Sequence, residues 1–329
     1  MAWYDESGRC REYVVSTRVR FARNLADYPF ASKMDQTSAK EICERVREVF
    51  PDYEYVDFTK IDSVEARSYV ERHLVSPNFL SSRFSHGLLT KGNTYIMVCE
   101  EDHMRIQSIY PGLAIDEAYK DAAGACDMAE EKLKIAYDDR LGYLTHCPTN
   151  LGTGMRVSVM MFLPALHITG GMRKVAAQLP KLGLTVRGIY GEGSNESGYL
   201  YQISNQVTLG VSERDTVDKL REITEQLIES EKRAEKALAA SREDALRDST
   251  RRSLGILRYA DMLTSAEYMD LYGKVRMGVN MGYINEVTYE ALDRLTVTTG
   301  PATLTLSGGS KDAVSRDKMR AAKVREELQ

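Results

Sequence analysis

The sequence contains no apolar run that is long enough to cross a membrane. No such run in the 329 residues approaches the ~18 residues that a membrane span needs, and residues 1–12 lack the apolar segment of a signal peptide. The five cysteines are odd in number, scattered and without C-x-x-C spacing, which argues against a disulfide framework and a zinc site. These absences favour a cytoplasmic protein with free thiols and no membrane partner.

An excess of one charge sign is also missing. The formal net charge is -4, so the chain lacks the basic balance typical of a protein that binds nucleic acid directly. The sequence has neither a G-x-x-x-x-G-K-[ST] loop nor the glycine loop of protein kinases. A protein without these loops can bind a nucleoside triphosphate only if other cations hold the phosphates.

Five arginines in polar or glycine-containing contexts are candidates for that task. Each lies at the end of a predicted strand or in a turn, and fixed guanidinium groups together with Mg²⁺ can stabilise a phosphoryl group in transfer. The alternative for the two arginines of segment 16–24 is the solvated edge of a strand. The five are Arg18, Arg20, Arg105, Arg156 and Arg187.

Two carboxylates and one thiol lie beside these arginines. Glu101 and Glu192 are in loops, where they could grip a cationic acceptor and take its proton, although an acidic cluster at 100–102 is more often a solvated turn. Cys147 precedes a Gly-x-Gly turn, which lets the backbone approach a ligand closely. Free cysteines are usually buried and inert, so a structural role for Cys147 stays open.

The periodicity of the first two-thirds of the chain alternates between helix and strand. Apolar residues at helical spacing predict helices over 38–50, 63–73, 115–136 and 172–179. Alternating patterns predict strands over 94–98, 184–187 and 199–209. Short strands between unequal helices do not match a doubly wound parallel sheet, so the expected class is α+β with an antiparallel sheet flanked by helices.

The last third is expected to be all-α. A long charged helix over 215–241 leads to a small polar segment at 239–244, which we interpret as the seam between domains 1–243 and 244–329. Thr264 to Glu267 forms a capping box that opens a helix with Leu271, Tyr272, Val275 and Val279 inward, and Gly282 ends it. The apolar faces in this domain suggest packing against another copy, as in a homodimer.

Five motifs together resemble the phosphagen (guanidino) kinases, and specifically their bacterial protein-arginine kinase branch. They occur in the family's order and spacing and cover most of residues 10–215. The family's catalytic unit is an antiparallel sheet edged by helices, in agreement with the periodicity. The motifs are STRVRFARN at 16–24, EEDHMRIQ at 100–107, CPTNLGTGMR at 147–156, RGIYGEG at 187–193 and ISNQVTLG at 203–210.

The resemblance implies roles for individual residues. Glu101 and Glu192 would hold the acceptor guanidinium and take its proton, with the Cys147 thiolate against one of its nitrogens. Mg²⁺ would be held by ATP oxygens and water, so no protein ligand to a metal is expected. The ATP site would comprise Ser16, Thr17, Arg18, Val19, Arg20, His73, Arg105, Arg156, Val157, Ser158, Arg187, Gly188 and Gly191.

Two further comparisons with the family concern branch and regulation. The catalytic motifs begin near residue 16, which leaves no room for the N-terminal domain that closes over a small substrate. Arg316, Asp317 and Arg320 match an R-D-x-x-R-A signature that the resemblance links to a regulatory phosphoarginine site; a plain Asp317–Arg320 surface pair is the alternative.

One motif position departs from the family: Cys99 replaces the usual asparagine and could loosen the loop that carries Glu101.

The sequence therefore predicts an ATP-dependent kinase of arginine residues in proteins. Such a mark would serve protein quality control or regulation, and exposed arginines of other proteins would be the partners. A kinase of free arginine or another small guanidino compound is one alternative. An inactive homologue that binds phosphoarginine through its C-terminal helix, as an adaptor, is the other.

Overall fold

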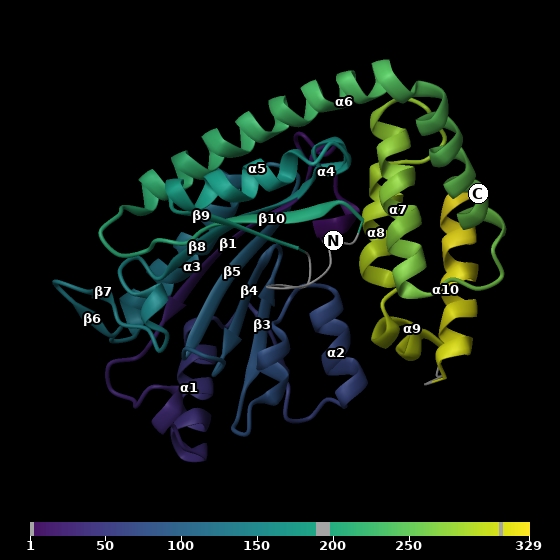
Figure 1. Ribbon diagram of the computed structural model, residues 1–329. Coiled ribbons are helices and arrows are strands. Elements are labelled where there is room, and N and C mark those ends of the chain that lie inside the picture. Colours follow the sequence, from purple (N-terminus) through teal and green to yellow (C-terminus); the bar gives the residue numbers. More distant parts are fainter. Residues whose placement is uncertain (1–2, 189–197, 309–311) are drawn as a thin grey trace.

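The computed structural model of the chain describes residues 3–188, 198–308 and 312–329. Its centre is a large antiparallel sheet with helices on both sides, followed by a helical region (Figure 1), which confirms the α+β class. A small hairpin of β6 (Tyr137–Asp138) and β7 (Gly142–Tyr143) lies apart from it. The strand order is β2 (Glu54–Asp57), β3 (Gly87–Lys91), β4 (Thr94–Val98), β5 (Met104–Pro111), β1 (Val14–Arg23), β8 (Met155–Phe162), β10 (Leu200–Asn205) and β9 (Leu184–Gly188).

The central strand β1 divides its residues between two different environments. Val19 and Phe21 are at most 1% exposed and belong to the main apolar core, whereas Arg18 and Arg20, at alternate positions, are only half-buried. Successive side chains of a strand point to opposite faces. One face of the sheet therefore forms the core, and the arginines are on the other.

The helices cover these two faces unequally. The core face packs against α1 (Gln36–Val49), α3 (Ile115–Lys132), α5 (Gly171–Gln178) and the first part of α6 (Glu213–Tyr259). Among the described residues, α2 (Ser63–Glu71) and the helical region pack against the arginine face. Short connecting helices are η1 (Trp3–Asp5), η2 (Ala31–Lys33), η3 (Pro77–Ser81), η4 (Pro148–Asn150), α4 (Pro164–Ile168) and η5 (Leu179–Leu182).

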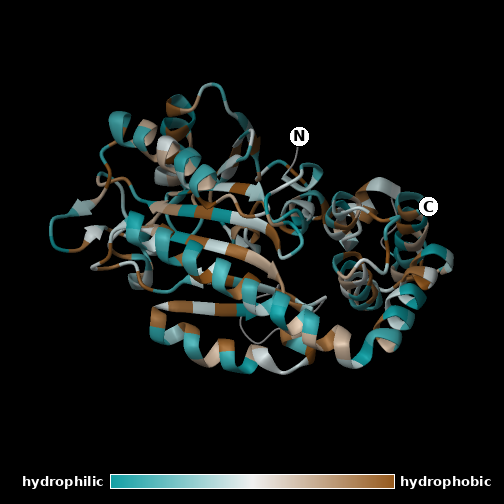
Figure 2. Cartoon of the chain, turned by 90° about the horizontal axis from the view of Figure 1, so that it is seen from above, coloured by the Kyte–Doolittle hydropathy of each residue, from teal (hydrophilic) through white to brown (hydrophobic). Residues whose placement is uncertain are grey.

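Helix α6 links the sheet to the helical region. It is 47 residues long and runs over the sheet before it bends alongside the other helices (Figure 1), with hydrophilic residues predominating along its exposed side (Figure 2). Only Arg242, with φ -145° and ψ 28°, leaves helical geometry. The predicted seam at 239–244 therefore coincides with a kink inside one helix, and the division into two domains stays a prediction.

The helical region contains α7 (Ser265–Asn280), α8 (Tyr289–Thr298), α9 (Pro301–Gly308) and α10 (Ala313–Leu328). Thr264 caps α7 by accepting a hydrogen bond from the Glu267 N–H at 3.2 Å, which confirms the predicted start. Gly282 has φ +70° just after the helix ends. Tyr272 and Val275 are fully buried, as expected, and they belong to an apolar cluster that also includes Phe162 and Leu200 of the sheet.

One predicted strand is too long. Residues 199–209 were expected to form the closing strand, but β10 ends at Asn205. The Asn205 amide donates to the carbonyls of Met155 at 3.1 Å and Val207 at 3.2 Å, so its side chain turns the backbone out of the sheet. None of the helices described in residues 3–188, 198–308 and 312–329 has both the length and the apolar character that a membrane crossing requires.

Candidate active site

Four of the five predicted arginines lie on three adjacent strands. Arg18 and Arg20 are two residues apart on β1, and Arg20 lies directly opposite Arg156 of β8. On the other side of β1, Ala22 lies opposite Arg105 of β5. Residues directly opposite each other in an antiparallel pair point to the same side of the sheet. The register therefore gathers these four guanidinium groups on one face.

The fifth arginine reaches the same face through β10. Gln202 of β10 lies opposite Arg187 of β9, and Ser204 lies opposite Ser158 of β8. Arg156 donates through Nη2 to Ser204 Oγ at 3.1 Å. The structure thus unites five arginines that the sequence separates by up to 169 positions, counting from 18 to 187.

Burial and mutual repulsion disfavour the charged form of the innermost arginines. Burial, and then the nearby Arg105 charge, lower the pKa of Arg18 to about 10. The pKa of Arg20 is also lowered, by burial and by the charges of Arg105, Arg156 and Arg18. Arg20 makes no ion pair within the described parts of the chain. A cationic cluster of this kind favours the binding of a polyanion.

Two glutamates in the turn between β4 and β5 face this cluster. Arg105 forms an ion pair with Glu100 and contacts Glu101 at 3.1 Å between Nη2 and Oε2. Burial alone would raise the pKa of Glu100, but the Arg105 charge and a hydrogen bond from Ser76 outweigh it and lower that pKa. The Glu101 side chain is 34% exposed, so a ligand can reach it.

Asp102 joins this turn to the loop that carries Cys147. Its Oδ1 accepts hydrogen bonds from the Asn24 amide at 2.7 Å and from the His146 N–H at 2.8 Å. Cys147 is half-buried, and its Sγ lies 3.0 Å from Thr149 Oγ1. The thiol is thus accessible and held near the acidic turn by a fully buried carboxylate.

The Gly-x-Gly turn after Cys147 requires glycine at both positions. Gly152 has φ +98° and Gly154 has φ +63°, conformations that other residues rarely adopt. A methyl group at Gly152 would lie 2.2 Å from the carbonyl oxygen of Thr208. The turn therefore fixes this loop against the segment that follows β10.

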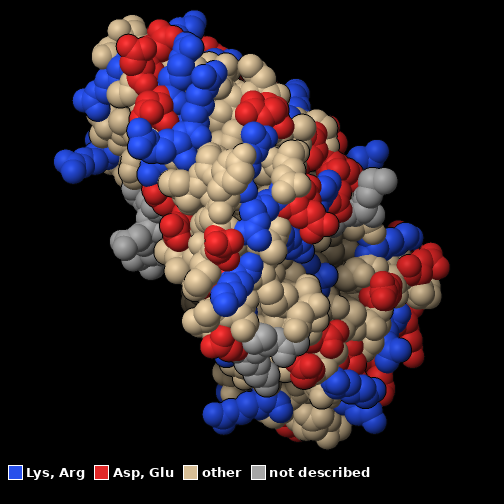
Figure 3. Space-filling view, turned by 90° about the vertical axis from the view of Figure 1, so that its right-hand side faces the viewer, with Lys and Arg blue, Asp and Glu red and all other residues tan. Residues whose placement is uncertain are grey.

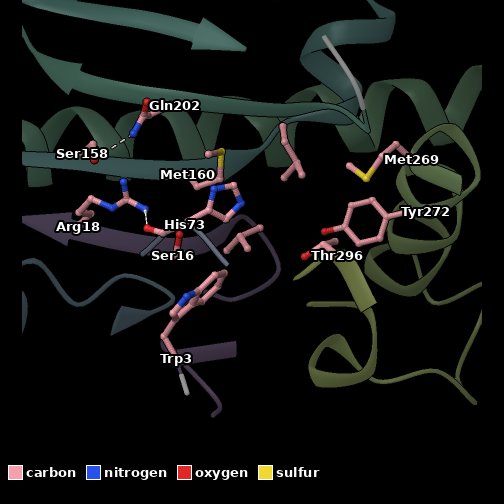
Figure 4. A pocket seen from close by; sticks show the side chains of 12 residues that line it. Trp3, Ser16, Arg18, His73, Ser158, Met160, Gln202, Met269, Tyr272 and Thr296 are labelled. Carbon is pink, nitrogen blue, oxygen red and sulfur yellow. Dashed lines mark hydrogen bonds between the residues drawn. The ribbon is translucent and has the colours of Figure 1, made fainter. Parts of the chain in front are cut away.

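A cavity of about 130 Å³ lies beside the arginine cluster (Figure 4). Four of the residues predicted for the ATP site line it: Ser16, Arg18, His73 and Ser158. Arg18 donates through Nη2 to the His73 carbonyl at 2.9 Å. Burial, and then the Arg18 charge, lower the pKa of His73 to about 4, so its imidazole is neutral near pH 7.

Three residues predicted for the ATP site do not present their side chains to this face. The Thr17 hydroxyl donates to the Gly112 carbonyl at 2.6 Å, and Val19 and Val157 are fully buried in the core. Val157 was also expected to cradle the nucleotide with its backbone, but its N–H donates to Asn205 Oδ1 at 2.8 Å. This N–H already has a partner inside the protein, and the role expected of Val157 in the nucleotide site stays a prediction.

Three predicted residues lie at the end of β9 or beyond it. Gly188 is the last residue of β9 and pairs with Tyr201 of β10. Gly191 and Glu192 lie outside the described residues, and the roles expected for them stay predictions.

The C-terminal signature lies on α10, away from the arginine face. Arg320 is 1% exposed and donates to the carbonyls of Thr299 at 3.0 Å and Leu263 at 2.6 Å, and to Asp317 at 2.6 Å. Arg316 and Asp317 are half-buried. The expectation that Arg316 and Arg320 together grip a phosphoryl group does not match this geometry, because the Arg320 head group is engaged inside the fold.

Sequence reasoning missed several residues around the cavity. Met160, two positions beyond Ser158 on β8, lines the cavity, as does Gln202 of β10. Strand periodicity from Arg156 onward was a signal that could have identified Met160. Met269 and Tyr272 line the cavity from α7, and helical spacing gave no sign of this role.

Comparisons with known proteins agree with this geometry. A model of the ATP:guanido phosphotransferase C-terminal catalytic domain matches residues 33–234, and a model of the protein-arginine kinase McsB C-terminal domain matches residues 243–329. Among solved structures, a duplicated taurocyamine kinase from Schistosoma mansoni aligns with a TM-score of 0.61 at 27% identity, over 67% of this chain and 33% of that one. A lombricine kinase shares the fold, with a TM-score of 0.61 over 70% of this chain and 68% of that one, at 24% identity.

Curated relatives match over the whole chain. A protein-arginine kinase of Syntrophomonas wolfei is 43% identical over 100% of this chain and 95% of its own length. One of Bacillus pumilus is 41% identical over 99% of this chain and 93% of its own length. The chain therefore belongs to the ATP:guanido phosphotransferases and, within them, to the protein-arginine kinase family.

Proposed function

We propose that this enzyme binds ATP on the arginine face and transfers the γ-phosphoryl group to arginine side chains of other proteins. The observation that carries the proposal is a gradient of charge along two neighbouring strands. A nucleoside triphosphate has the same polarity, with an uncharged base and sugar at one end and phosphates at the other. From the cavity toward the cluster, β1 presents Ser16, Arg18 and Arg20, and β8 presents Met160, Ser158 and Arg156.

The acidic turn and the thiol loop supply the groups for the acceptor. A guanidinium nitrogen of the acceptor attacks the γ-phosphorus, the bond to the β,γ-bridging oxygen breaks, and ADP leaves. Glu101 is the described carboxylate best placed to hold the acceptor and to take the proton from the attacking nitrogen. Glu192 would share this task, and Cys147 would contact a second guanidinium nitrogen.

Arg105 changes partners in this scheme. In the structure it is paired with Glu100 and Glu101, two of the carboxylates that face the cluster. Phosphate oxygens compete for the same guanidinium, since bidentate arginine–phosphate pairs are strong. ATP binding would then draw Arg105 away from Glu101 and leave this carboxylate available for the acceptor. The order in which the two substrates bind would follow from this exchange.

We expect Mg²⁺ to arrive with ATP and to offset the phosphate charge. Its ligands would be phosphate oxygens and water, with Glu100 and Glu101 as the nearest carboxylates of the described face. Within the described residues, no group of three or more His, Cys, Asp and Glu side chains is arranged to hold a metal ion.

Support for a protein acceptor comes from the relatives named protein-arginine kinase, which match this chain over nearly its full length. The test is to measure kcat/KM with an arginine-containing unfolded protein and with free arginine, with phosphoarginine mapped by mass spectrometry. We expect the protein to be used far better. Comparable values would favour a small guanidino kinase. ATP binding without transfer to either acceptor would favour the adaptor.

For the helical region we propose a homodimer contact. The end of α6 and the following turn expose Ile256 at 40%, Tyr259 at 83% and Met262 at 43%. The outer face of this region shows uncharged surface between charges of both signs (Figure 3), a composition compatible with association. In sedimentation velocity, Tyr259→Asp should shift a wild-type dimer toward monomer; a monomeric wild-type protein would contradict the proposal.

The regulatory phosphoarginine site also remains a proposal, now centred on Arg316 and Asp317. These two residues are half-buried at the start of α10, whereas Arg320 supports them from inside through its contact with Asp317. A charged guanidinium can pair with the phosphoryl group and a carboxylate with the guanidinium of phosphoarginine. Asp317→Asn and Arg316→Ala should each weaken phosphoarginine binding in calorimetry, and unchanged binding in both would remove the site.

A further inference from the structure

The cavity next to the arginine cluster has a second wall that does not belong to the catalytic sheet. Figure 4 shows Met269, Tyr272 and Thr296 on the side opposite Ser16 and His73. Met269 and Tyr272 come from α7, and Thr296 comes from α8. Both helices lie in the part of the chain that matches the C-terminal domain model, outside the guanido phosphotransferase match.

We propose that this wall completes the ATP site, so that the helical region binds the adenosine end while the sheet binds the phosphates. The inference rests on the proposed function and adds residues of α7 and α8 to the nucleotide site. The cavity lies at the uncharged end of the gradient, beyond Arg18. If the arginines bind the phosphates, the base and sugar of ATP must lie in this cavity.

The chemistry of the wall suits a nucleoside. Met269 offers a polarizable apolar surface, which packs well against aromatic rings. The hydroxyl of Tyr272 points toward the cavity in Figure 4 and accepts a hydrogen bond from Arg276 at 3.2 Å, and its own proton has no acceptor among the described residues. Tyr272 is fully buried, so this proton is a donor that a ligand oxygen or nitrogen in the cavity can satisfy.

Helix α7 is fixed against the sheet at the cavity edge. A methyl group added at Gly273 would lie 3.0 Å from the backbone of Gly198, so the two backbones touch just before β10 begins. Arg276 donates to the Arg11 carbonyl at 2.7 Å and so joins α7 to the segment before β1. The wall is therefore held in place by a backbone contact at Gly273 and by the side-chain hydrogen bond of Arg276.

A second contact joins the helical region to the other side of the cavity. Glu71 of α2 accepts hydrogen bonds from the N–H groups of Ala302 at 2.7 Å and Thr303 at 2.8 Å, at the first turn of α9. His73, which lines the cavity, follows two residues later. A nucleoside in the cavity would contact both bodies at once, so its binding energy would also hold them together.

The test compares ATP with inorganic tripolyphosphate, which has the phosphates and no nucleoside. Thr296→Met places a larger side chain at the cavity, and we expect the Kd for ATP to rise on the order of tenfold or more while the Kd for tripolyphosphate stays unchanged. Thr298→Met is the matched control, because two residues along a helix turn the side chain by roughly 200° to another face. Both constants should stay at wild-type values in this control.

Wild-type ATP affinity in Thr296→Met would overturn the inference. Failure of the proposed function has a different signature, because wild-type protein would then bind neither ATP nor tripolyphosphate. If Thr296→Met does not fold, hydrogen exchange of the wild-type protein decides. ATP should slow exchange in α7 and α8 more than tripolyphosphate does, and equal protection by the two ligands would refute the shared site.

Discussion

Replacing Arg320 with alanine tests whether this residue supports the fold or binds a ligand. Its guanidinium is buried and donates to the backbone carbonyls of Thr299 and Leu263 and to Asp317. Leu263 is fixed twice, since its own N–H donates to the Asp317 carbonyl at 3.1 Å. Arg320 thus connects α10 both to the turn before α7 and to the end of α8. Alanine would leave two buried carbonyls without a hydrogen-bond donor.

The expected cost follows from those two carbonyls. An unsatisfied buried acceptor costs about 1–3 kcal/mol, so the free energy of unfolding should fall by roughly 3–5 kcal/mol once the loss of the Asp317 pair is included. At ~2–4 °C per kcal/mol, the melting temperature should drop by roughly 6–20 °C in differential scanning calorimetry. Arg316→Ala is the control and should change stability by about 1 kcal/mol or less. An Arg320→Ala protein that melts within a degree of wild type would refute the structural role and restore Arg320 as a candidate ligand for phosphoarginine.

Three further predictions concern the catalytic face. Glu101→Gln should lower the rate of transfer by about two orders of magnitude or more and leave the Kd for ATP nearly intact, and near-wild-type turnover would contradict its role. Iodoacetamide should alkylate the half-exposed Cys147 faster than the buried Cys43 and Cys126, with ATP and an acceptor protecting it; uniform labelling would indicate a structural thiol. The pKa of His73 is lowered to about 4 in the folded protein, below the 6.5 of the unfolded chain, so its contribution to stability is present above pH 6.5 and is lost as the pH falls toward 4. In urea unfolding, His73→Asn should reduce the pH dependence of the free energy of unfolding across that window. A pH dependence equal to that of the wild type would contradict the burial of a neutral imidazole.

Local patterns predicted most elements because local contacts determine them. The start of α7 depends on Thr264, whose hydroxyl accepts a hydrogen bond from the Glu267 N–H three residues later. At the predicted seam 239–244 the chain stays helical because the segment contains neither glycine nor proline, and one residue out of helical geometry, Arg242, is enough to redirect α6. Strand β10 was predicted too long because the hydrogen bonds of Asn205 to Met155 join residues that are 50 positions apart.

The residues of the candidate site likewise fall into those that the sequence could predict and those that it could not. The arginines could be predicted because each has an unusual polar or glycine-containing context, and antiparallel pairing then places Arg20 opposite Arg156. The far wall of the cavity could not be predicted. Met269 and Tyr272 have the spacing of an ordinary helical core, and only the docking of α7 at Gly198 turns them toward the sheet.

Cys99 shows why a substitution at a motif position need not change the site. The sequence suggested that a thiol in place of asparagine could loosen the turn that carries Glu101. Cys99 has φ +60°, a conformation that costs roughly 1–3 kcal/mol for residues other than glycine and that asparagine tolerates better. However, the turn is closed by a hydrogen bond from the Cys99 N–H to the His103 carbonyl at 2.9 Å and by the contact of Arg105 with Glu101. Neither contact uses the side chain of residue 99, which lies 1% exposed with its Sγ 3.7 Å from the Ala39 carbonyl of α1. The position of Glu101 therefore depends on the backbone and on Arg105, and the thiol fills the space beneath the turn.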